Sequence, residues 1–255
     1  GLGTCMNCDE VFQLHTFKRK GSTDKVYNKP EWKNNILLSD NAVKWFEARG
    51  ISQKTLVKAQ ITEDVEWMPQ VSKEVNTIQF NYFINNELIN IKYRDGRKNF
   101  KLVKGAEKIF YNLDSTVGHD YVVIVEGEMD ALSFMDAKVD SVVSVPNGAT
   151  LNRLNLDYLD NCIEYFENKS KIILAVDGDD AGQNLQQELI RRFGAEVCFT
   201  IDFGEHKDAN EYLLNYGGSM LKRLVDEASP VPLENVVTLK DVNNELQEFI
   251  HEGFK

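Results

Sequence analysis

Two clusters of carboxylates, each directly after a short apolar run, are the residues whose types and spacing could do chemistry. The first cluster follows the run at 122–125, and the second follows the run at 172–176. Their members are Glu126, Glu128, Asp130, Asp177, Asp179 and Asp180. Grouped carboxylates repel one another unless a cation lies between them. Because hard oxygen ligands suit Mg²⁺ or Mn²⁺, the sequence predicts a divalent-metal site that would hold phosphate groups through the metal.

The elements that must hold these acids in place are expected to be strands of a parallel sheet. Short apolar runs rich in β-branched residues are typical of strands buried on both faces. Strands that alternate with helices predict right-handed crossovers and a parallel sheet of about four strands. Ligands of such sheets bind beyond the carboxyl ends of the strands, where both acidic clusters fall. We expect strands at 121–125, 141–145, 171–176 and 196–201, and helices at about 129–138, 153–167 and 181–193.

The part of the chain before these strands has a different pattern and carries much of the positive charge. Ser39 and Ser52 are each expected to cap a short helix, the first reaching Arg49 and the second Gln60. Alternating residues on either side of an Asn-Asn pair at 85–86 predict an antiparallel hairpin. The hairpin runs into the segment 92–108, which holds seven basic residues and two acids. We therefore expect an α+β basic subdomain followed by an α/β domain with a parallel sheet.

The basic segment has two interpretations. A basic loop on an antiparallel sheet, interleaved with aromatic residues, can hold a single strand of nucleic acid or a nucleotide. Lysines that keep the edge of a surface hairpin soluble would give the same pattern. In a strand, alternate residues share a face, so Lys92 and Arg94 are expected to point together. The candidates for contact with phosphate are Lys92, Arg94, Arg97, Lys98 and Lys101.

Composition and charge narrow the class of protein. The 255 residues carry a net charge of −11, which argues against a protein coated in nucleic acid. The segment 112–216 holds twenty acids and seven bases, so its balance is −13. This division fits a protein that binds a polyanion with its basic segment and performs metal chemistry with its acidic segment. Charged side chains that are simply solvated at the surface would give the same division. No apolar run approaches the roughly 20 residues that span a membrane, and the first residues lack a signal-peptide pattern.

Cys5 and Cys8 form a C-x₂-C knuckle, which is half of a zinc ribbon. A structural zinc needs four ligands, so a second pair is expected upstream in a longer chain, unless the knuckle arose by chance. We expect Zn²⁺ only in such a longer chain. Four cysteines are too few for a disulfide framework of this size, and cytosolic thiols are the default.

Three motifs together resemble the catalytic core of TOPRIM domains. They lie at 126–130 (E-G-E-M-D), 177–182 (D-G-D-D-A-G) and 207–211 (K-D-A-N-E), in this order and in strand context. The match is to primases of the phage and Twinkle-like primase–helicase group. The segment 92–101 resembles the basic motif that precedes TOPRIM in these primases, and the Cys5–Cys8 knuckle resembles the tail of their zinc ribbon.

The resemblance implies a DNA primase: a nucleotidyltransferase that joins ribonucleoside triphosphates into short primers on a single-stranded DNA template. It implies that Glu126, Asp177, Asp179 and Asp208 are catalytic metal ligands, although Glu126 as a general base fits equally well. Lys207 would contact phosphate or neutralise the acids. Asp180 is expected to cap the helix at 181–193. One of Glu128 and Asp130 is expected to cap a helix or to support the ligands.

The resemblance also divides the chain and names its surroundings. Residues 1–35 would be a remnant of the zinc ribbon with its linker, 36–115 the basic subdomain, 116–228 the TOPRIM domain, and 229–255 a linker toward a helicase domain. The helicase would be a partner in the same full-length protein, in a bacterial or phage-infected cytoplasm or in an organelle. The printed sequence contains no G-x-x-x-x-G-K-[ST] motif, so it is not the helicase motor.

Two other functions use the same acids. A TOPRIM nuclease or topoisomerase would cleave DNA, but the sequence offers no convincing nucleophilic tyrosine, and a basic hairpin placed before TOPRIM favours polymerisation. A TOPRIM domain that binds DNA without priming would serve as an accessory module of a replicative helicase. The products formed from single-stranded DNA, ribonucleotides and divalent metal would separate the three.

Overall fold

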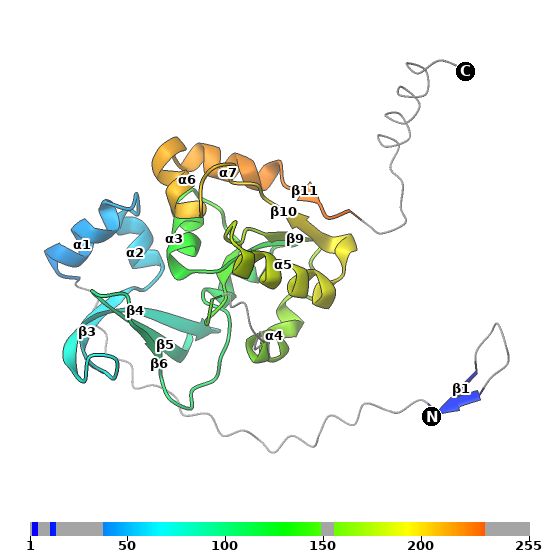
Figure 1. Ribbon diagram of the computed structural model, residues 1–255, viewed down its shortest axis with the longest axis horizontal. Helices are drawn as coiled ribbons and strands as arrows, with labels where there is room; N and C mark the ends of the chain where they lie inside the picture. The colour runs from blue at the N-terminus through cyan, green and yellow to red at the C-terminus, as the bar shows by residue number, and fades with distance from the viewer. Residues whose placement is uncertain (1, 5–10, 14–37, 149–155, 233–255) are drawn as a thin grey trace, which may run out of the picture.

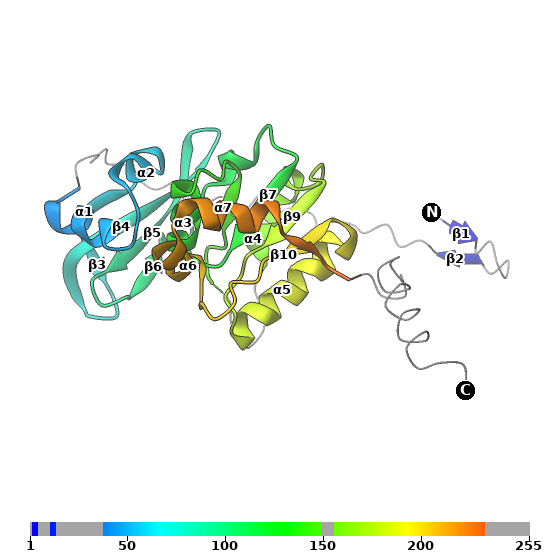
Figure 2. The same ribbon diagram turned by 90° about the horizontal axis from the view of Figure 1, so that it is seen from above.

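The computed structural model describes residues 2–4, 11–13, 38–148 and 156–232. Two strands near the start, β1 (Leu2–Thr4) and β2 (Val11–Gln13), pair antiparallel (Figure 2). The knuckle residues Cys5 and Cys8 lie outside the described residues. Among those residues, no helix is long and apolar enough to cross a membrane.

Two short helices begin the main body, and each has the cap that the sequence predicts. They are α1 (Asp40–Glu47) and α2 (Gln53–Lys58). The side chain of Ser39 accepts a hydrogen bond from the amide of Ala42, and Ser52 accepts one from Thr55. A capping side chain satisfies a backbone donor that has no partner inside the helix, which fixes where the helix starts. Both helices end slightly before the expected positions.

An antiparallel sheet of four strands follows, in the order β3-β4-β5-β6 (Figure 1). The hairpin between β4 and β5 turns at Asn85 and Asn86, whose φ angles are 52° and 62°. Positive φ at both central residues is what a tight two-residue hairpin turn requires, so the expected hairpin is confirmed. The strands are β3 (Thr62–Met68), β4 (Lys73–Ile84), β5 (Glu87–Asp95) and β6 (Phe100–Leu102).

The second sheet has five strands in the order β11-β10-β9-β7-β8. The four strands β10, β9, β7 and β8 are parallel, as predicted, and β11 adds an antiparallel edge. The α/β fold class expected for this part of the chain is therefore confirmed. The strands are β7 (Tyr121–Val125), β8 (Val142–Ser144), β9 (Lys171–Leu174), β10 (Cys198–Thr200) and β11 (Ser229–Pro230).

Helices cover both faces of this sheet. In Figure 1, α3, α6 and α7 lie above it, and α4 and α5 lie below it. This division follows from right-handed crossovers, because β7 leads to β8 in one direction while β9 leads to β10 in the other. The helices are α3 (Glu128–Asp136), α4 (Asp157–Cys162), α5 (Asp180–Phe193), α6 (Ala209–Tyr216) and α7 (Gly218–Asp226), with single 3₁₀ turns at Leu113–Thr116, Ile163–Tyr165 and Ala195–Val197.

One expectation needs correction, and one pair of helices was not predicted. The helix expected at 153–167 is shorter, because α4 ends at Cys162 and a 3₁₀ turn follows; residues 149–155 lie outside the described ranges. The pair α6 and α7 was missed. The signal was present, since Asp208 and Glu211 have the spacing of a capping box, and Gly217 between the two helices has a φ of 80°.

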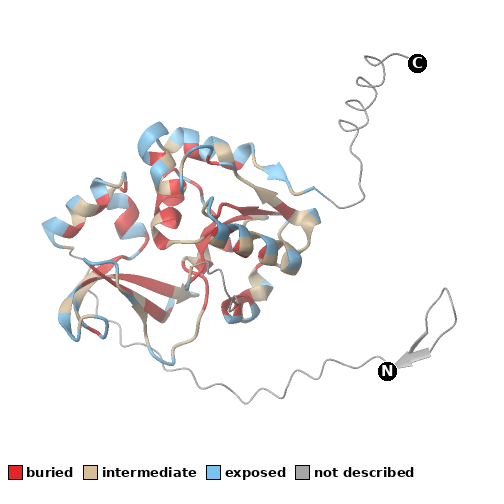
Figure 3. Cartoon of the chain, in the orientation of Figure 1, coloured by how far each residue is buried: buried red, intermediate tan, exposed pale blue. Residues whose placement is uncertain are grey.

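One hydrophobic core joins the two sheets. Phe46 of α1 and Tyr82 of β4 belong to the same buried cluster as the apolar residues of β7, β8 and β9. Figure 3 colours the inner strands of both sheets largely as buried. A second, small cluster lies on the other face of the antiparallel sheet, around Met68 and Ile91. The antiparallel sheet and the parallel sheet are thus held in a fixed relation by shared packing.

Candidate functional site

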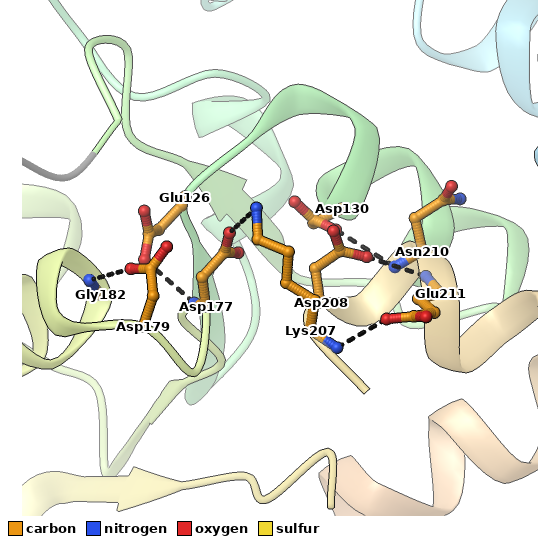
Figure 4. A network of polar contacts seen from close by, with 9 residues as sticks. All are labelled: Glu126, Asp130, Asp177, Asp179, Gly182, Lys207, Asp208, Asn210 and Glu211. Atoms are coloured by element: carbon orange, nitrogen blue, oxygen red, sulfur yellow. Dashed lines mark hydrogen bonds and ion pairs between the residues drawn. The ribbon is translucent and has the colours of Figure 1, made fainter. Parts of the chain in front are cut away.

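The two acidic clusters meet at the point where the strand order of the parallel sheet reverses. The chain leaves β7 toward β8 on one side, and leaves β9 toward β10 on the other, so a crevice opens between the carboxyl ends of β7 and β9. Glu126 follows β7 and Asp177 follows β9. Glu126 Oε1 accepts a hydrogen bond from the amide of Asp177 at 3.0 Å (Figure 4). Two acids that are 51 residues apart in sequence are therefore in direct contact.

Asp179 caps α5, and Asp180 does not. Asp179 Oδ1 accepts from the amide of Gly182 at 3.0 Å, while Asp180 is the exposed first residue of the helix. The prediction that Asp180 caps this helix is wrong, because the extended backbone of Asp179 places its own side chain over the free amides of the first turn. Asp179 is thus turned toward the helix, beside Glu126 (Figure 4).

Gly182 is required by the contact between the two clusters. A Cβ atom at this position would overlap the carbonyl oxygen of Asp177 and lie 2.5 Å from Glu126 Oε1. No side chain fits at that separation, so the first turn of α5 can approach the two acids only with glycine. The sequence showed this glycine inside a motif, but its steric role was visible only in the structure.

Asp208 arrives from the start of α6. Its Oδ1 atom accepts from the amide of Glu211 at 2.8 Å, and Glu211 Oε2 accepts from the amide of Lys207 at 2.7 Å. This reciprocal arrangement resembles a capping box and fixes the entry of the chain into α6. Asp208 lies beside Asp130 in Figure 4. Asp130 Oδ1 in turn accepts from the amide of Asn210 at 3.2 Å.

Carboxylates outnumber cationic side chains in this site, and the pKa values of two of the carboxyl groups are raised. Burial raises the pKa of Asp130 well above its ordinary value, and the charges of Asp208, Asp177 and Glu126 raise it further. Burial also raises the pKa of Asp177, which Lys207 opposes through an ion pair of 3.4 Å between Nζ and Oδ2. The same pair raises the pKa of Lys207. One exposed lysine therefore does not balance the acids.

Glu128 takes no part in capping. The residue that caps α3 is Gly127, which has no side chain, so neither Glu128 nor Asp130 caps this helix. Glu128 Oε1 accepts from the hydroxyl of Tyr82 at 2.5 Å, and its two oxygens accept from Lys92 Nζ at 2.8 and 3.0 Å. Both Glu128 and Tyr82 are buried. This network fastens the antiparallel sheet to the loop that carries Glu126, and no sequence pattern pointed to Tyr82.

A pocket of about 460 Å³ lies between the acids and the basic strand. Lys92 and Phe100 line it on the side of the antiparallel sheet, and the loop containing Asn147 and Gly148 lines it after β8. Gly148 has a φ of 65°, which favours glycine there. The acidic residues that line the pocket are Glu126, Glu128, Asp130 and Asp177. The pocket thus offers both signs of charge.

The basic candidates do not share one surface. Lys92 Nζ and the Arg94 guanidinium carbon lie 5.3 and 5.8 Å from the ring centre of Phe100, so these two side chains share a face of β5. Lys101 lies on the opposite face, where its Nζ atom pairs with Glu66 at 2.8 Å. Residues 97–98 are exposed in the turn between β5 and β6. Lys92 and Arg94 therefore lie on the same face as Phe100, and Lys92 lines the pocket together with that ring.

The donor set is suitable for a divalent cation, although the acids are not arranged around one. Within the described ranges, no three acidic, histidine or cysteine side chains are gathered closely enough to hold a metal ion. One carboxylate oxygen of Asp179 and one of Asp208 accept helix-capping hydrogen bonds. Burial and neighbouring charge raise the pKa values of Asp130 and Asp177. A bound cation would lower both pKa values again. Hard carboxylate oxygens of this number fit Mg²⁺-like ions.

Comparisons with known proteins identify the domain. A family model described as Toprim-like matches residues 123–213. The Twinkle homolog protein of Arabidopsis thaliana, chloroplastic/mitochondrial, is 33% identical over 83% of this chain, and the Primase homolog protein of the same plant is 35% identical over 78%. This chain covers 32% and 62% of those two proteins, less than two thirds of either.

A solved structure shows the same fold over most of the chain. The primase fragment of bacteriophage T7 primase-helicase protein superposes with a TM-score of 0.58 at 24% identity, covering 89% of this chain and 90% of that one. The family match begins within β7, covers both acidic clusters and ends within α6. The chain therefore belongs to the TOPRIM proteins of the phage and Twinkle-like primase group.

Proposed function

We propose that this chain is the RNA-polymerase part of a DNA primase, which joins ribonucleoside triphosphates into short primers on single-stranded DNA. The observation that carries the proposal is the contact of Glu126 with Asp177, whose pKa the charges of Asp208 and Asp179 raise, beside a pocket that Lys92 also lines. Metal-bound acids beside a phosphate-binding surface are what nucleotidyl transfer needs. Names of the relatives, a Primase homolog protein and a phage primase-helicase, support the same reaction.

The roles of the acids follow from their hydrogen bonds. Glu126 uses Oε1 to accept the Asp177 amide, so we assign it to hold the metal with its second oxygen, directly or through water. We assign Asp177, which contacts both Glu126 and Lys207, as the second metal ligand. Asp179 and Asp208 each spend one oxygen on a helix cap and keep the other for the cation. Asp130 is buried and its pKa is raised by burial and by the charge of Asp208, so a bound cation would favour its ionised form.

The metal, Mg²⁺ or Mn²⁺, would neutralise the triphosphate and stabilise the charge that develops as pyrophosphate leaves. The protein's own contribution is to orient the reactants. Lys92 is held on the wall of the pocket by Glu128, where its ammonium meets an entering phosphate. Arg94 lies on the same face of β5 and continues the positive surface toward the template. Lys207 balances Asp177 until the cation binds.

The partners follow from this reaction. We propose single-stranded DNA as template, ribonucleoside triphosphates as substrates, and a replicative helicase domain in the full-length protein, in a phage-infected or bacterial cell or in an organelle. The chain's coverage of about a third of the Twinkle homolog leaves room for such a domain. Zn²⁺ would belong to a zinc ribbon completed beyond Cys5 and Cys8. Residues 36–115 and 116–228 would supply the basic surface and the acids, respectively.

Primer synthesis is the direct test. The protein is incubated with single-stranded DNA, ribonucleoside triphosphates and Mg²⁺ or Mn²⁺, and the products are separated by size. Short oligoribonucleotides are expected. Asp179→Asn and Asp208→Asn should abolish them, because asparagine keeps each helix cap while the charge is lost. Asp180→Asn is the matched control, since Asp180 is exposed and caps nothing.

The other products decide between the alternatives. Cleaved DNA would show that the protein is a TOPRIM nuclease and not a primase. Neither product, with tight DNA binding retained, would indicate an accessory module of a helicase. If Asp179→Asn and Asp208→Asn make primers at the parental rate, the protein is a primase but these two residues are not its metal ligands.

A further inference from the structure

A second pocket lies between the end of α2, the strand β4 and the 3₁₀ turn Leu113–Thr116. Its volume is about 350 Å³, and none of the residues that line it also lines the pocket beside the acids. Pockets that bind small molecules in proteins begin at about 300 Å³. This second pocket is therefore large enough for a ligand of its own.

One buried side chain that lines the second pocket lacks a hydrogen-bond partner. Asn81 is only 2% exposed, and its buried Oδ1 atom has no partner among the residues that the structure describes. Its Nδ2 atom donates to the carbonyl of Gln60 at 2.8 Å and to Thr62 Oγ1 at 3.0 Å. Because the carbonyl of Gln60 can only accept, these bonds fix the orientation of the amide, and the unpaired atom is an acceptor. A buried acceptor without a partner costs free energy, which a donor group of a ligand would recover.

A single water molecule does not account for the space around this acceptor. A water molecule takes up about 30 Å³ in the liquid, so one water would satisfy Oδ1 and leave most of the pocket unfilled. The pocket is also shaped by backbone in an uncommon conformation, since Gln60 and Asn112 line it with φ angles of 51° and 59°. Positive φ costs free energy in residues other than glycine, and such residues cluster at ligand sites. The side chain of Asn112 is held by its hydrogen bond of 2.8 Å to the carbonyl of Val142.

The lining of the second pocket suits a flat ligand without net negative charge. Phe83 and Tyr111 each contribute an aromatic ring, and Tyr111 is buried. Flat heterocycles pack favourably on aromatic side chains. With histidine counted as neutral, the charged side chains of the lining are two acids, Asp114 and Asp140, and one lysine, Lys58. The pocket therefore has no surplus of positive charge that would attract a phosphate group.

We propose that this pocket binds a nucleobase that carries no phosphate, either as the free base or as the nucleoside. An N–H group of the base would donate to Asn81 Oδ1, and the ring would pack on Phe83. Adenine, cytosine and guanine each offer an exocyclic amine as donor. The strand that carries Asn81 and Phe83 also carries Tyr82, whose hydroxyl donates to Glu128 beside the acids. The two pockets are thus separate but share one strand.

Equilibrium binding in EDTA tests this site, because the chelator removes the divalent metal that would hold a nucleotide at the acids. The full chain is titrated with adenosine, cytidine, guanosine and uridine by isothermal titration calorimetry. Asn81→Leu removes the acceptor at similar side-chain volume, and Phe83→Leu removes the aromatic ring. The matched control is Phe199→Leu, which replaces a half-buried phenylalanine of β10 that lines neither pocket.

At least one nucleoside is expected to bind the parent chain with a dissociation constant below about 1 mM. Asn81→Leu should weaken this binding by about fivefold or more, as the loss of one buried hydrogen bond implies. Phe83→Leu should weaken it by about threefold or more, because the stacking contact is lost. Phe199→Leu should change it by less than about twofold. The triphosphate of the same nucleoside should compete less well than the nucleoside, since the acids of the lining repel its charge.

Failure of all four nucleosides to bind the parent below about 1 mM would overturn the proposal. Equal affinity of the parent and Phe83→Leu would also overturn it, because the ligand would then lie elsewhere. This variant keeps an apolar side chain and serves as the test if Asn81→Leu does not fold. A triphosphate that displaces the nucleoside as readily as the free nucleoside does would overturn the neutral ligand class. The result is independent of primer synthesis, because binding is measured without template and without metal.

Discussion

Replacing Gly182 by alanine tests the contact between the two acidic loops. In an exposed helix this change stabilises by about 1 kcal/mol, because alanine restricts the unfolded chain and favours helix. Here the added methyl group would overlap the carbonyl oxygen of Asp177 and lie 2.5 Å from Glu126 Oε1. The obstacle on one side is backbone, so the methyl group cannot be accommodated by turning a flexible side chain. The expected sign of the change in stability is therefore reversed.

The magnitude follows from the two contacts. Overpacking of this kind costs about 1–3 kcal/mol. Displacing Glu126 also weakens its hydrogen bond from the Asp177 amide, which adds about 1 kcal/mol. After the helix preference is subtracted, Gly182→Ala should lower the free energy of unfolding by about 1–3 kcal/mol. For a chain of this size, each kcal/mol lowers the melting temperature by about 2–4 °C.

Thermal and urea unfolding, followed by circular dichroism in EDTA, measure this change. Gly178→Ala is the matched control in the same loop, because a methyl group added there would have no heavy atom within 4 Å. Its stability should stay within about 0.5 kcal/mol of the parent. A Gly182→Ala protein as stable as the parent, or more stable, would show that α5 does not approach Glu126 as described.

Three further changes test the electrostatics of the site. Mg²⁺ at about ten times its dissociation constant should raise the free energy of unfolding by about 1.4 kcal/mol, and Asp177→Asn should remove this increment in a thermal-shift titration. Lys92→Met leaves the buried Glu128 carboxylate without its cation and should lower the free energy of unfolding in urea by about 3–5 kcal/mol. The double variant Lys92→Met/Glu128→Gln should recover much of this loss. Burial and then neighbouring acids raise the pKa of Asp130, so the native state holds a proton that the unfolded chain releases, and stability falls as pH rises from the ordinary carboxyl range through the raised pKa. The free energy of unfolding of Asp130→Asn at pH 8 in EDTA should therefore be higher than that of the parent, and the difference should close in acid. A difference that stays constant at all pH values would contradict the raised pKa.

Local patterns in the sequence predicted the elements well. The alternation around Asn85 and Asn86 indicated the hairpin, and the apolar runs at 121–125 and 171–176 indicated two neighbouring parallel strands. Fold rules for parallel sheets then placed Glu126 and Asp177 at one edge. These inferences succeed because they depend on periodicity and connection geometry, which the sequence displays directly.

What the sequence could not show are contacts between residues far apart in the chain. Tyr82 and Glu128 are 46 residues apart, and the hydroxyl of one is a partner for the other only after both sheets are packed. Arg49 and Arg94 meet over Trp45 for the same reason. The choice between Asp179 and Asp180 as the helix cap depends on one backbone conformation, which composition does not fix.

The single apolar interior shared by both sheets limits how this molecule can be divided. A shortened chain that kept only residues 123–213 would lack the aromatic side chains of Phe46, Phe80 and Tyr82. In the whole chain these side chains belong to the core that also buries the parallel sheet. Its newly uncovered apolar face would favour self-association over folding. Biochemists who wish to study the acidic half by itself should therefore redesign that face with polar residues before expressing it.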